Sequence, residues 1–354
     1  MLIDAHLDLA MNALLLGRDL TGSALDTRAR EGENPRCGNS TVGLADLRRG
    51  DIGICFATVS VLACRAWIPP GDLNFRSPDD AHQQGRDQIA YYRSLEADGQ
   101  IRILTDRASL ESHLENWQSK NEEQRQHEPI GVVFLLEGAY PIREPAELSD
   151  WFNWGVRIIG LSWAGSDYAG GTYGPGRLTQ KGRELLAGMQ RAGVILDISH
   201  LNDSSFYDVL DAYEGPVLGS HVNCRALVPG DRQLTDQMIR ALIERDAVLG
   251  TACDTWMVVP GWKKKVTSPA TCPMDRLVDH IDHVCQLAGN SRHAAIGSDL
   301  DGGYGTEQSP GDLDTIADLS RLPELMSARG FSDDDIAAIT HGNWIRKLRS
   351  AWKT

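Results

Sequence analysis

The chain has 354 residues, of which 42% are apolar and 24% are charged, the composition of an ordinary globular protein. Its net charge of -14 argues against a nucleic-acid partner, because no stripe of Lys and Arg is present to neutralise phosphates. No apolar stretch approaches the roughly 20 residues that a membrane span needs, so no membrane partner is expected.

The ends of the chain and its cysteines bear on location. The first predicted strand begins at Leu2, with no basic and apolar segment before it, so we expect no signal peptide. The seven cysteines, an odd number without a C-x-x-C spacing, indicate reduced thiols rather than a disulfide framework. We therefore expect a cytoplasmic protein.

Short apolar runs alternate with longer amphipathic segments along the chain. The apolar runs predict eight strands, at Leu2–Ala5, Gly53–Val61, Ile130–Leu136, Val156–Leu161, Val194–Ile198, Pro216–Ser220, Ala247–Thr251 and Ala294–Gly297. The segments between them predict helices at Asp80–Ala97, Ala108–Lys120, Pro145–Trp154, Thr179–Ala192, Ser204–Ala212, Thr235–Glu244 and Met274–Ala288. Strands separated by helices are typical of βαβ units with a parallel sheet.

Eight such units predict an α/β protein with a (β/α)8 TIM barrel, formed by residues 1–354 as a single domain. The usual barrel of about 250 residues leaves this chain room for insertions. A further short run at Ile101–Leu104 blurs the strand count, and a doubly wound open sheet stays open as an alternative. The tail predicts extra helices packed outside the barrel, at Asp312–Arg329, Ser332–Thr340 and Asn343–Trp352.

Three long segments rich in Gly, Pro and Trp are predicted to be loops, at Thr21–Gly43, Ser162–Arg177 and Cys253–Pro273. Each follows a predicted strand, so in a barrel all three would rise over the carboxyl-terminal face. Their aromatic residues indicate ordered loops that cover a ligand, since long loops in compact domains are usually functional or disordered.

Ionisable residues stand at the carboxyl ends of five predicted strands. They are His6, Asp8, Glu137, His200, His221 and Asp299. His6 and Asp8 are two residues apart on one strand and so point the same way. In a TIM barrel this end of the strands carries the catalytic residues. Buried carboxylates and imidazoles need a partner, and a metal centre would serve all of them.

The six groups are too many for one metal ion but suit two. Glu137, the single Glu of the set and central in strand order, is the natural bridge, because a carboxylate can span ions roughly 3.5–4 Å apart. Imidazole and carboxylate ligands suit zinc or manganese, and the spacing does not distinguish zinc from other divalent metals.

The other histidines are expected to be structural. His280 and His283 share a helix, but Val278, Ile281 and Val284 define its buried face, which places both histidines on the solvated side. Surface positions are expected for His82, His113, His127 and His293, and a structural position for His341 before the last helix.

At these residues the chain resembles the membrane (renal-type) dipeptidases, a family of binuclear zinc peptidases. The matching segments run in the family's order: Asp4 to Leu9, Leu135 to Gly138, Gly155 to Leu161, Gly193 to His200, Ser220 to Arg232, Gly297 to Gly302, and Gly342 to Trp344. The resemblance thus covers the chain from its first strand to its last helix.

The resemblance implies roles for the site residues. His6, Asp8 and Glu137 would hold one zinc ion, and His200, His221 and the bridging Glu137 the second. Asp299 would be the general acid/base, and Arg232 would bind the substrate carboxylate with its planar fork. The implied reaction is hydrolysis of a dipeptide, plausibly L-Xaa-D-Xaa, by a metal-bridging water.

The chain departs from the family at Trp163, where better-known members carry a His thought to contact the substrate. An indole donates one hydrogen bond and cannot become cationic. A related metal-dependent amidohydrolase, acting on N-acyl amino acids or lactones, is therefore the alternative enzyme, and a non-catalytic metal- or ligand-binding barrel a remoter one. The apolar faces of the terminal helices could support a homodimer.

Overall fold

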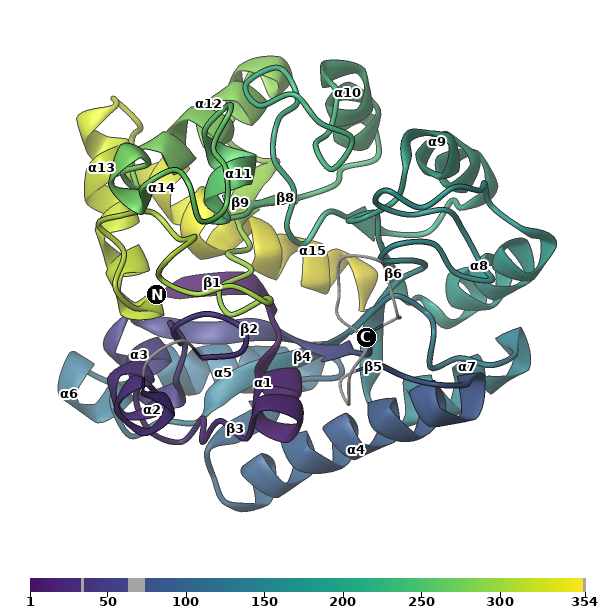
Figure 1. The fold of residues 1–354 in the computed structure, drawn as a ribbon, viewed down its shortest axis with the longest axis horizontal. Coiled ribbons are helices and arrows are strands. Elements are labelled where there is room, and N and C mark those ends of the chain that lie inside the picture. The colour runs from purple at the N-terminus through teal and green to yellow at the C-terminus, as the bar shows by residue number, and fades with distance from the viewer. Residues whose placement is uncertain (33–34, 63–73, 353–354) are drawn as a thin grey trace.

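The structure, a computed structural model, describes residues 1–32, 35–62 and 74–352. Strands and helices alternate along it, with helices surrounding the strands at the centre of Figure 1. The strands of this part of the chain are β1 (Leu2–Leu7), β2 (Ile52–Ser60), β3 (Ile101–Ile103), β4 (Ile130–Glu137), β5 (Val156–Gly160), β6 (Ile195–Asp197), β7 (Val217–Leu218), β8 (Leu249–Thr251) and β9 (Ala294–Ile296).

The strand pairings are parallel and define an α/β fold with a curled sheet. One sheet has the order β1-β2-β4-β5-β6-β7, and β8 pairs with β9 in a second sheet. A bridge between Gly219 and Leu249 joins the two sheets, and the Asp299 amide donates to the His6 carbonyl at 3.2 Å on the other side. The strand order runs in one direction, without the reversal of a doubly wound sheet.

The run at Ile101–Leu104 forms a real strand, β3. It pairs with β4 from Ile130 to Val132, whereas β5 pairs with the part of β4 from Phe134 to Leu136. The two short strands therefore share one edge of β4, which is why the sequence shows nine strand-like runs.

The helices predicted between strands are present. They are α4 (Pro78–Ala97), α5 (Arg107–Gln118), α7 (Leu148–Asn153), α8 (Gln180–Ala192), α9 (Asp203–Ala212), α10 (Asp236–Glu244) and α12 (Arg276–Ala288), with a 3-10 turn η1 (Pro145–Glu147) before α7. Local capping explains several of their starts: Ser77, Thr179 and Thr235 each accept a hydrogen bond from the backbone amide three residues later. The tail forms η3 (Ile316–Arg321), α13 (Leu322–Ala328), α14 (Asp333–Ala337), a π-helical turn η4 (Ala338–Gly342) and α15 (Asn343–Ala351).

Two of the predicted loops contain helices. The segment Thr21–Gly43 includes α2 (Ala24–Glu31), which begins at a capping box formed by Ser23 and Asp26. The segment Cys253–Pro273 includes α11 (Thr255–Val258) and η2 (Pro269–Thr271). Three further short helices, α1 (Leu9–Leu16), α3 (Leu44–Arg49) and α6 (Glu122–Arg125), were also not predicted.

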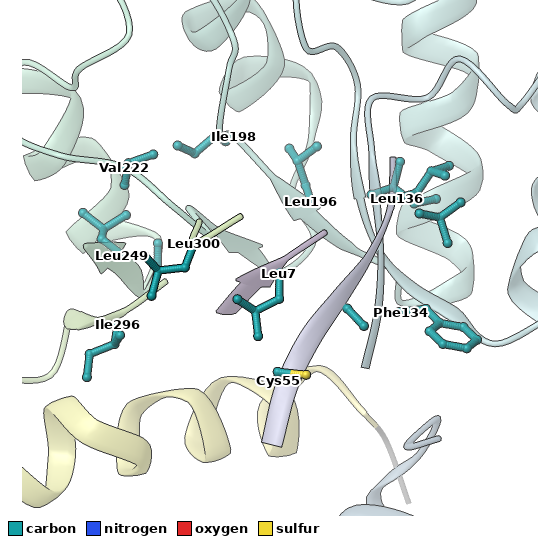
Figure 2. Packing of buried hydrophobic residues seen from close by; sticks show 14 of the residues in the cluster. Leu7, Cys55, Phe134, Leu136, Leu196, Ile198, Val222, Leu249, Ile296 and Leu300 are labelled. Carbon is teal, nitrogen blue, oxygen red and sulfur yellow. The ribbon is translucent and has the colours of Figure 1, made fainter. Parts of the chain in front are cut away.

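Buried apolar side chains form two clusters that correspond to the two faces of the strands. The larger cluster contains Cys55, Leu136 and Leu196 (Figure 2), together with helix residues such as Leu185 and Ile281. The smaller cluster holds Phe56, Leu135 and other residues that alternate with these along the strands.

The last helix packs on this second, inner cluster. Trp344 lies edge-on to Phe56, with ring centroids 5.2 Å apart, and its indole N–H donates to the Ile296 carbonyl. The helix α15 thus differs from a helix on the outer face of the strands, because it packs against their inward-facing residues. A large aromatic side chain on α15 fills the space between inward-facing residues, which burial of apolar area favours.

The structure also bears on the cysteines and on membrane-spanning helices. The six described cysteines are free thiols. Among the residues that the structure describes, no helix is long and apolar enough to cross a membrane.

Candidate active site

His6 and Asp8 face the inside of the curled sheet because β1 contains a bulge. Asp4 pairs with Cys55 and Leu7 with Ala57, so three steps along β1 match two along β2. The extra residue changes the alternation of side chains at this point. His6 and Asp8 consequently lie on one side of β1, and Leu7 enters the outer cluster.

Glu137 ends β4 and continues the inward-facing series of Val133 and Leu135. The neighbouring strand β2 supplies two hydroxyls that hold the carboxylates. Ser60 Oγ donates to Glu137 Oε2 at 2.8 Å, and Thr58 Oγ1 donates to Asp8 Oδ1. Both carboxylates are therefore fixed in orientation by groups of one strand.

His200 and His221 lie just beyond β6 and β7 and converge on Glu137. Glu137 Oε1 is 3.3 Å from the Nε2 atoms of both His6 and His200, and 3.6 Å from that of His221. The His200 and His221 Nε2 atoms are 2.9 Å apart. His200 has a φ of 67°, a left-handed conformation that is uncommon for a non-glycine residue and is concentrated at functional sites.

Asp299 lies beyond β9, with a φ of 59°. Its Oδ1 is 3.9 Å from His6 Nε2, the same distance as Asp8 Oδ1 from that nitrogen. The structure thus brings all six predicted groups, from five strand ends, around one point.

Hydroxyl groups that the sequence did not single out anchor the three imidazoles. Ser220 Oγ donates to Asp197 Oδ2 at 2.6 Å and contacts His6 Nδ1 at 3.1 Å and His221 Nδ1 at 2.7 Å. A hydroxyl has one proton, which the carboxylate of Asp197 takes as the stronger acceptor, so Ser220 can only accept from the two imidazoles. We infer from this network that both rings carry hydrogen on Nδ1 and present Nε2 as an acceptor.

His200 is held in the same way. Thr172 Oγ1 lies 3.0 Å from His200 Nδ1 and donates to the His200 carbonyl oxygen at 3.2 Å. The three Nε2 atoms therefore all face Glu137. A serine precedes both His200 and His221 in the sequence, but only the fold shows which serine orients a ring.

The close approach of β7, β8 and β9 depends on two glycines. A Cβ atom at Gly250 or Gly297 would lie 2.0 or 1.7 Å from the Ser220 carbonyl oxygen. A side chain at either position would displace the turn that carries Ser220 and His221.

The pKa of His6 is shifted in the opposite direction from the pKa values of His200 and His221. Burial alone would lower the pKa of His6, but the nearby carboxylates of Glu137 and Asp299 raise it to about 10. Burial lowers the pKa of His200 to about 3 and that of His221 well below its ordinary value, with the charge of Arg232 acting in the same direction. Positive charge is therefore favoured between the carboxylates, and the other two imidazoles are neutral acceptors.

This donor set fits a metal ion. His6 Nε2 is buried and has no hydrogen-bond partner among the described residues. Two neutral imidazole acceptors at 2.9 Å repel each other unless a cation lies between them and the carboxylate. The geometry places the candidate ligands in three groups, each with its ligand atoms within 4.8 Å of one another: His6, Asp8 and Glu137; Glu137, His200 and His221; and His6, His221 and Asp299.

The cluster opens into a cavity of about 660 Å³, within the usual range for small-molecule sites. Arg232 and Trp163, both predicted to contact substrate, line this cavity. Arg232 Nη2 donates to the His221 carbonyl oxygen at 2.8 Å, whereas its buried Nη1 has no partner within the described part of the chain. The Trp163 ring centroid lies 5.8 Å from that of His200.

Three histidines expected on the surface are buried instead. His280 accepts from the Cys224 amide and contacts the Val258 carbonyl oxygen at 3.2 Å, because the loop at 223–234 and α11 cover its side of α12. His113 contacts the Gly53 carbonyl oxygen at 2.8 Å, and His293 that of Ala247 at 2.7 Å. They serve structural hydrogen bonds, and the candidate metal groups of the described residues do not include them.

Comparison with known proteins gives the family. The family described as membrane dipeptidase (Peptidase family M19) matches residues 1–354. The chain belongs to the membrane dipeptidase family. Membership identifies it as a hydrolase of a metallopeptidase family, in agreement with the resemblance seen in the sequence, and supports a metal cofactor at the cluster.

Similar proteins in sequence include a protein of Klebsiella pneumoniae that is uncharacterised, 29% identical over 65% of this chain and 85% of its own length. A dipeptidase of Aspergillus oryzae is 30% identical over 63% of this chain. The chain spans about half the length of that fungal relative, 52%.

Solved structures show the same fold. A metallopeptidase from Rhodobacter sphaeroides, bound to a phosphinate mimic of the dipeptide L-Ala-D-Ala, has a TM-score of 0.80 at 21% identity and 99% coverage of both chains. A dipeptidase of family M19 has a TM-score of 0.78 at 21% identity, with 100% of this chain and 99% of that chain covered.

Proposed function

We propose that this member of the membrane dipeptidase family is a zinc-dependent dipeptidase. In this proposal the two sheets together form a single (β/α)8 barrel domain, with the active site at the carboxyl ends of its strands. His6, Asp8 and Glu137 would hold one zinc ion, and His200, His221 and Glu137 the other. Glu137 is suited to both groups because its Oε1 lies within 3.6 Å of all three imidazole Nε2 atoms.

The observation that carries the proposal is the pairing of this cluster with Arg232. The guanidinium is buried, with an exposed fraction of 5%, and lines the same cavity as Glu137 and His200. Its Nη1 finds no acceptor in the described residues, so a ligand carboxylate would complete its hydrogen bonding. A free carboxylate beside an amide-cleaving centre is a feature of a dipeptide substrate.

The residues of the chain divide the work of hydrolysis. Bound zinc would supply Lewis-acid polarisation of the scissile carbonyl and a water of lowered pKa. Arg232 would fix the substrate carboxylate and limit the enzyme to short peptides. Burial, together with Asp8 and Glu137, raises the pKa of Asp299 well above its ordinary value, so this carboxylate can hold a proton and pass it to the leaving amine.

The stereochemistry of the substrate is the finer part of the proposal. An L-Xaa-D-Xaa dipeptide is supported by the fold shared with the Rhodobacter sphaeroides metallopeptidase, whose ligand mimics L-Ala-D-Ala. Trp163 favours the alternative of an N-acyl amino acid, because its indole lies beside His200 where better-known members of the family carry a histidine thought to contact the substrate.

The test is hydrolysis by zinc-reconstituted protein of L-L and L-D dipeptides and N-acyl amino acids. Turnover of dipeptides that a chelator abolishes and zinc restores is expected. Turnover of N-acyl amino acids alone would show that the same site belongs to an amidohydrolase and not to a dipeptidase. A chelator-insensitive reaction, or none with zinc bound, would refute the proposal.

A further inference from the structure

A buried carboxylate on the cavity wall has no role in the chemistry proposed above. Asp254 follows β8, lines the same cavity as Arg232 and Asp299, and is 6% exposed. Its partners are neutral: Trp256 Nε1 donates to Oδ2 at 2.6 Å, and Gln308 Nε2 lies 2.8 and 2.9 Å from the two oxygens. No ion pair to Asp254 forms within the part of the chain that the structure describes.

The side-chain oxygen of Gln308 is a second hydrogen-bond acceptor in the cavity wall, and it receives no hydrogen bond from the described residues. Its amide orientation is set, because Nε2 donates to Asp254 and leaves Oε1 as an acceptor. Oε1 has no hydrogen-bond partner among the described residues, although the side chain is 5% exposed and lines the cavity. The Gln308 backbone is fixed by Thr255, whose amide and hydroxyl both donate to its carbonyl oxygen. Asp254 and Gln308 are thus a rigid pair with surplus accepting capacity, and a buried charge without a counter-ion is costly.

The position of this pair indicates which part of a substrate it would meet. Arg232 follows β7, Asp254 follows β8 and Asp299 follows β9, and these strands are neighbours through the Gly219–Leu249 bridge and the β8–β9 pairing. In a dipeptide, the α-carbon of the C-terminal residue lies between its carboxylate and the scissile amide. With the carboxylate at Arg232 and the amide beside Asp299, the side chain of that residue would lie on the part of the wall between them, where Asp254 follows the middle strand.

We propose that Asp254 and Gln308 form a subsite for a cationic side chain, an ammonium or guanidinium, on the C-terminal residue of the dipeptide. The proposal rests on the dipeptidase function. Trp256 and Trp262 also line the cavity and would contact the aliphatic stem and the charge of such a side chain. Burial raises the pKa of Asp254 to about 7, so a bound cation would also stabilise the ionised carboxylate.

Besides the buried Arg232, two exposed cations of the chain line the cavity. Arg36 and Lys264 lie on the rim, and neither forms an ion pair with Asp254 in the described structure. If Lys264 neutralised Asp254 in solution, the subsite would show no preference for a cationic substrate. Substrate selectivity therefore separates the two possibilities.

The experiment compares kcat/KM of the zinc-loaded enzyme for alanyl-lysine and alanyl-norleucine, each with L and D second residues. Norleucine keeps the stem and lacks the ammonium. We expect wild-type enzyme to favour lysine by about 10- to 100-fold, the range for a hydrogen bond to a charged group. The Asp254→Asn variant should lose most of this ratio, whereas Asp231→Asn, at an exposed acidic residue beside Arg232, should keep it.

The wild-type comparison needs no variant, so a folding defect in Asp254→Asn cannot obscure the result. Equal kcat/KM for the two substrates would overturn the subsite and leave the dipeptidase function intact. A preference for lysyl-alanine over norleucyl-alanine, without one at the second residue, would overturn the assignment to the C-terminal side chain. Absence of hydrolysis of all four by zinc-loaded protein would instead refute the dipeptidase function and the subsite with it.

Discussion

Replacement of Ser220 by alanine tests how the proposed metal ligands are oriented. Ser220 Oγ accepts from His6 Nδ1 at 3.1 Å and from His221 Nδ1 at 2.7 Å, and these rings belong to different proposed zinc sites. Without the hydroxyl, each ring can move its hydrogen to Nε2, which removes the lone pair from the metal side. Ser220→Ala should therefore weaken metal binding at both sites while the chain stays folded.

The magnitude follows from the number of hydrogen bonds lost. Loss of an outer partner of a metal-binding histidine typically costs about 10- to 100-fold in metal affinity. That range corresponds to roughly 1.4 to 3 kcal/mol. Because Ser220 serves two rings and Thr172 one, Ser220→Ala should reduce affinity at two sites and Thr172→Val at one.

The assay is competitive titration of metal-free protein with zinc against a chelating indicator, together with metal content after dialysis. Ser199→Ala is the control: Ser199 Oγ accepts from the His221 amide at 3.3 Å and lies 3.3 Å from Ser220 Oγ, and within the described structure it has no hydrogen bond to an imidazole ring. A smaller loss is expected there. Unchanged affinity and stoichiometry in Ser220→Ala would refute the assignment of the hydrogens to Nδ1.

Three other predictions concern the proton carrier, the carboxylate site and a buried lysine. Asp299→Asn should abolish kcat while metal content stays constant; loss of metal would instead make Asp299 a ligand. Arg232→Lys should mainly raise KM, because an ammonium cannot reproduce the planar fork; an unchanged KM would remove Arg232 from the substrate site. Burial lowers the pKa of Lys347 from 10.5 to about 8, so the unfolded chain binds this proton more tightly and stability should rise as pH increases from 8 towards 10.5. Lys347→Met should raise the free energy of unfolding at pH 7 by up to roughly 3 kcal/mol and remove that rise; urea denaturation at pH 7 and 10 measures both, and an unaltered pH dependence would contradict the reasoning.

The sequence predicted the strand alternation and the grouping of six ionisable residues, because both depend on local pattern. Apolar runs such as Ile130–Leu136 define strands, and an ionisable residue just beyond each run must lie at the same edge of a parallel sheet. The short helices α2 and α11 were missed because their segments read as loops rich in Gly, Pro and polar residues. The burial of His280 was missed for the same reason, because α11 and the loop before α10 cover the side of α12 that carries this residue.

Other features depend on contacts between distant residues. The bulge in β1 is set by pairing with β2, and no local pattern indicates it. Asp254 stands beyond β8 as Asp299 stands beyond β9, so the rule that selected the six candidate ligands also applies to it. Its neutral partners distinguish it from the candidate ligands, and one of them, Gln308, is 54 residues away in the chain.

The direction of the hydrogen bonds at the cluster originates at Asp197. This carboxylate accepts from the amides of Ser199 and Ser220, each at 3.0 Å, and from the Ser220 hydroxyl. Since the Asp197 oxygens act as acceptors in all three contacts, the Ser220 hydroxyl proton points towards them and the Ser220 oxygen is left to accept from two imidazoles. An asparagine amide in its place could donate to the Ser220 oxygen, and the Ser220 hydroxyl could then donate to an imidazole instead of accepting from it. A buried carboxylate on β6 that contacts no candidate ligand side chain therefore determines which nitrogen His6 and His221 present to a metal.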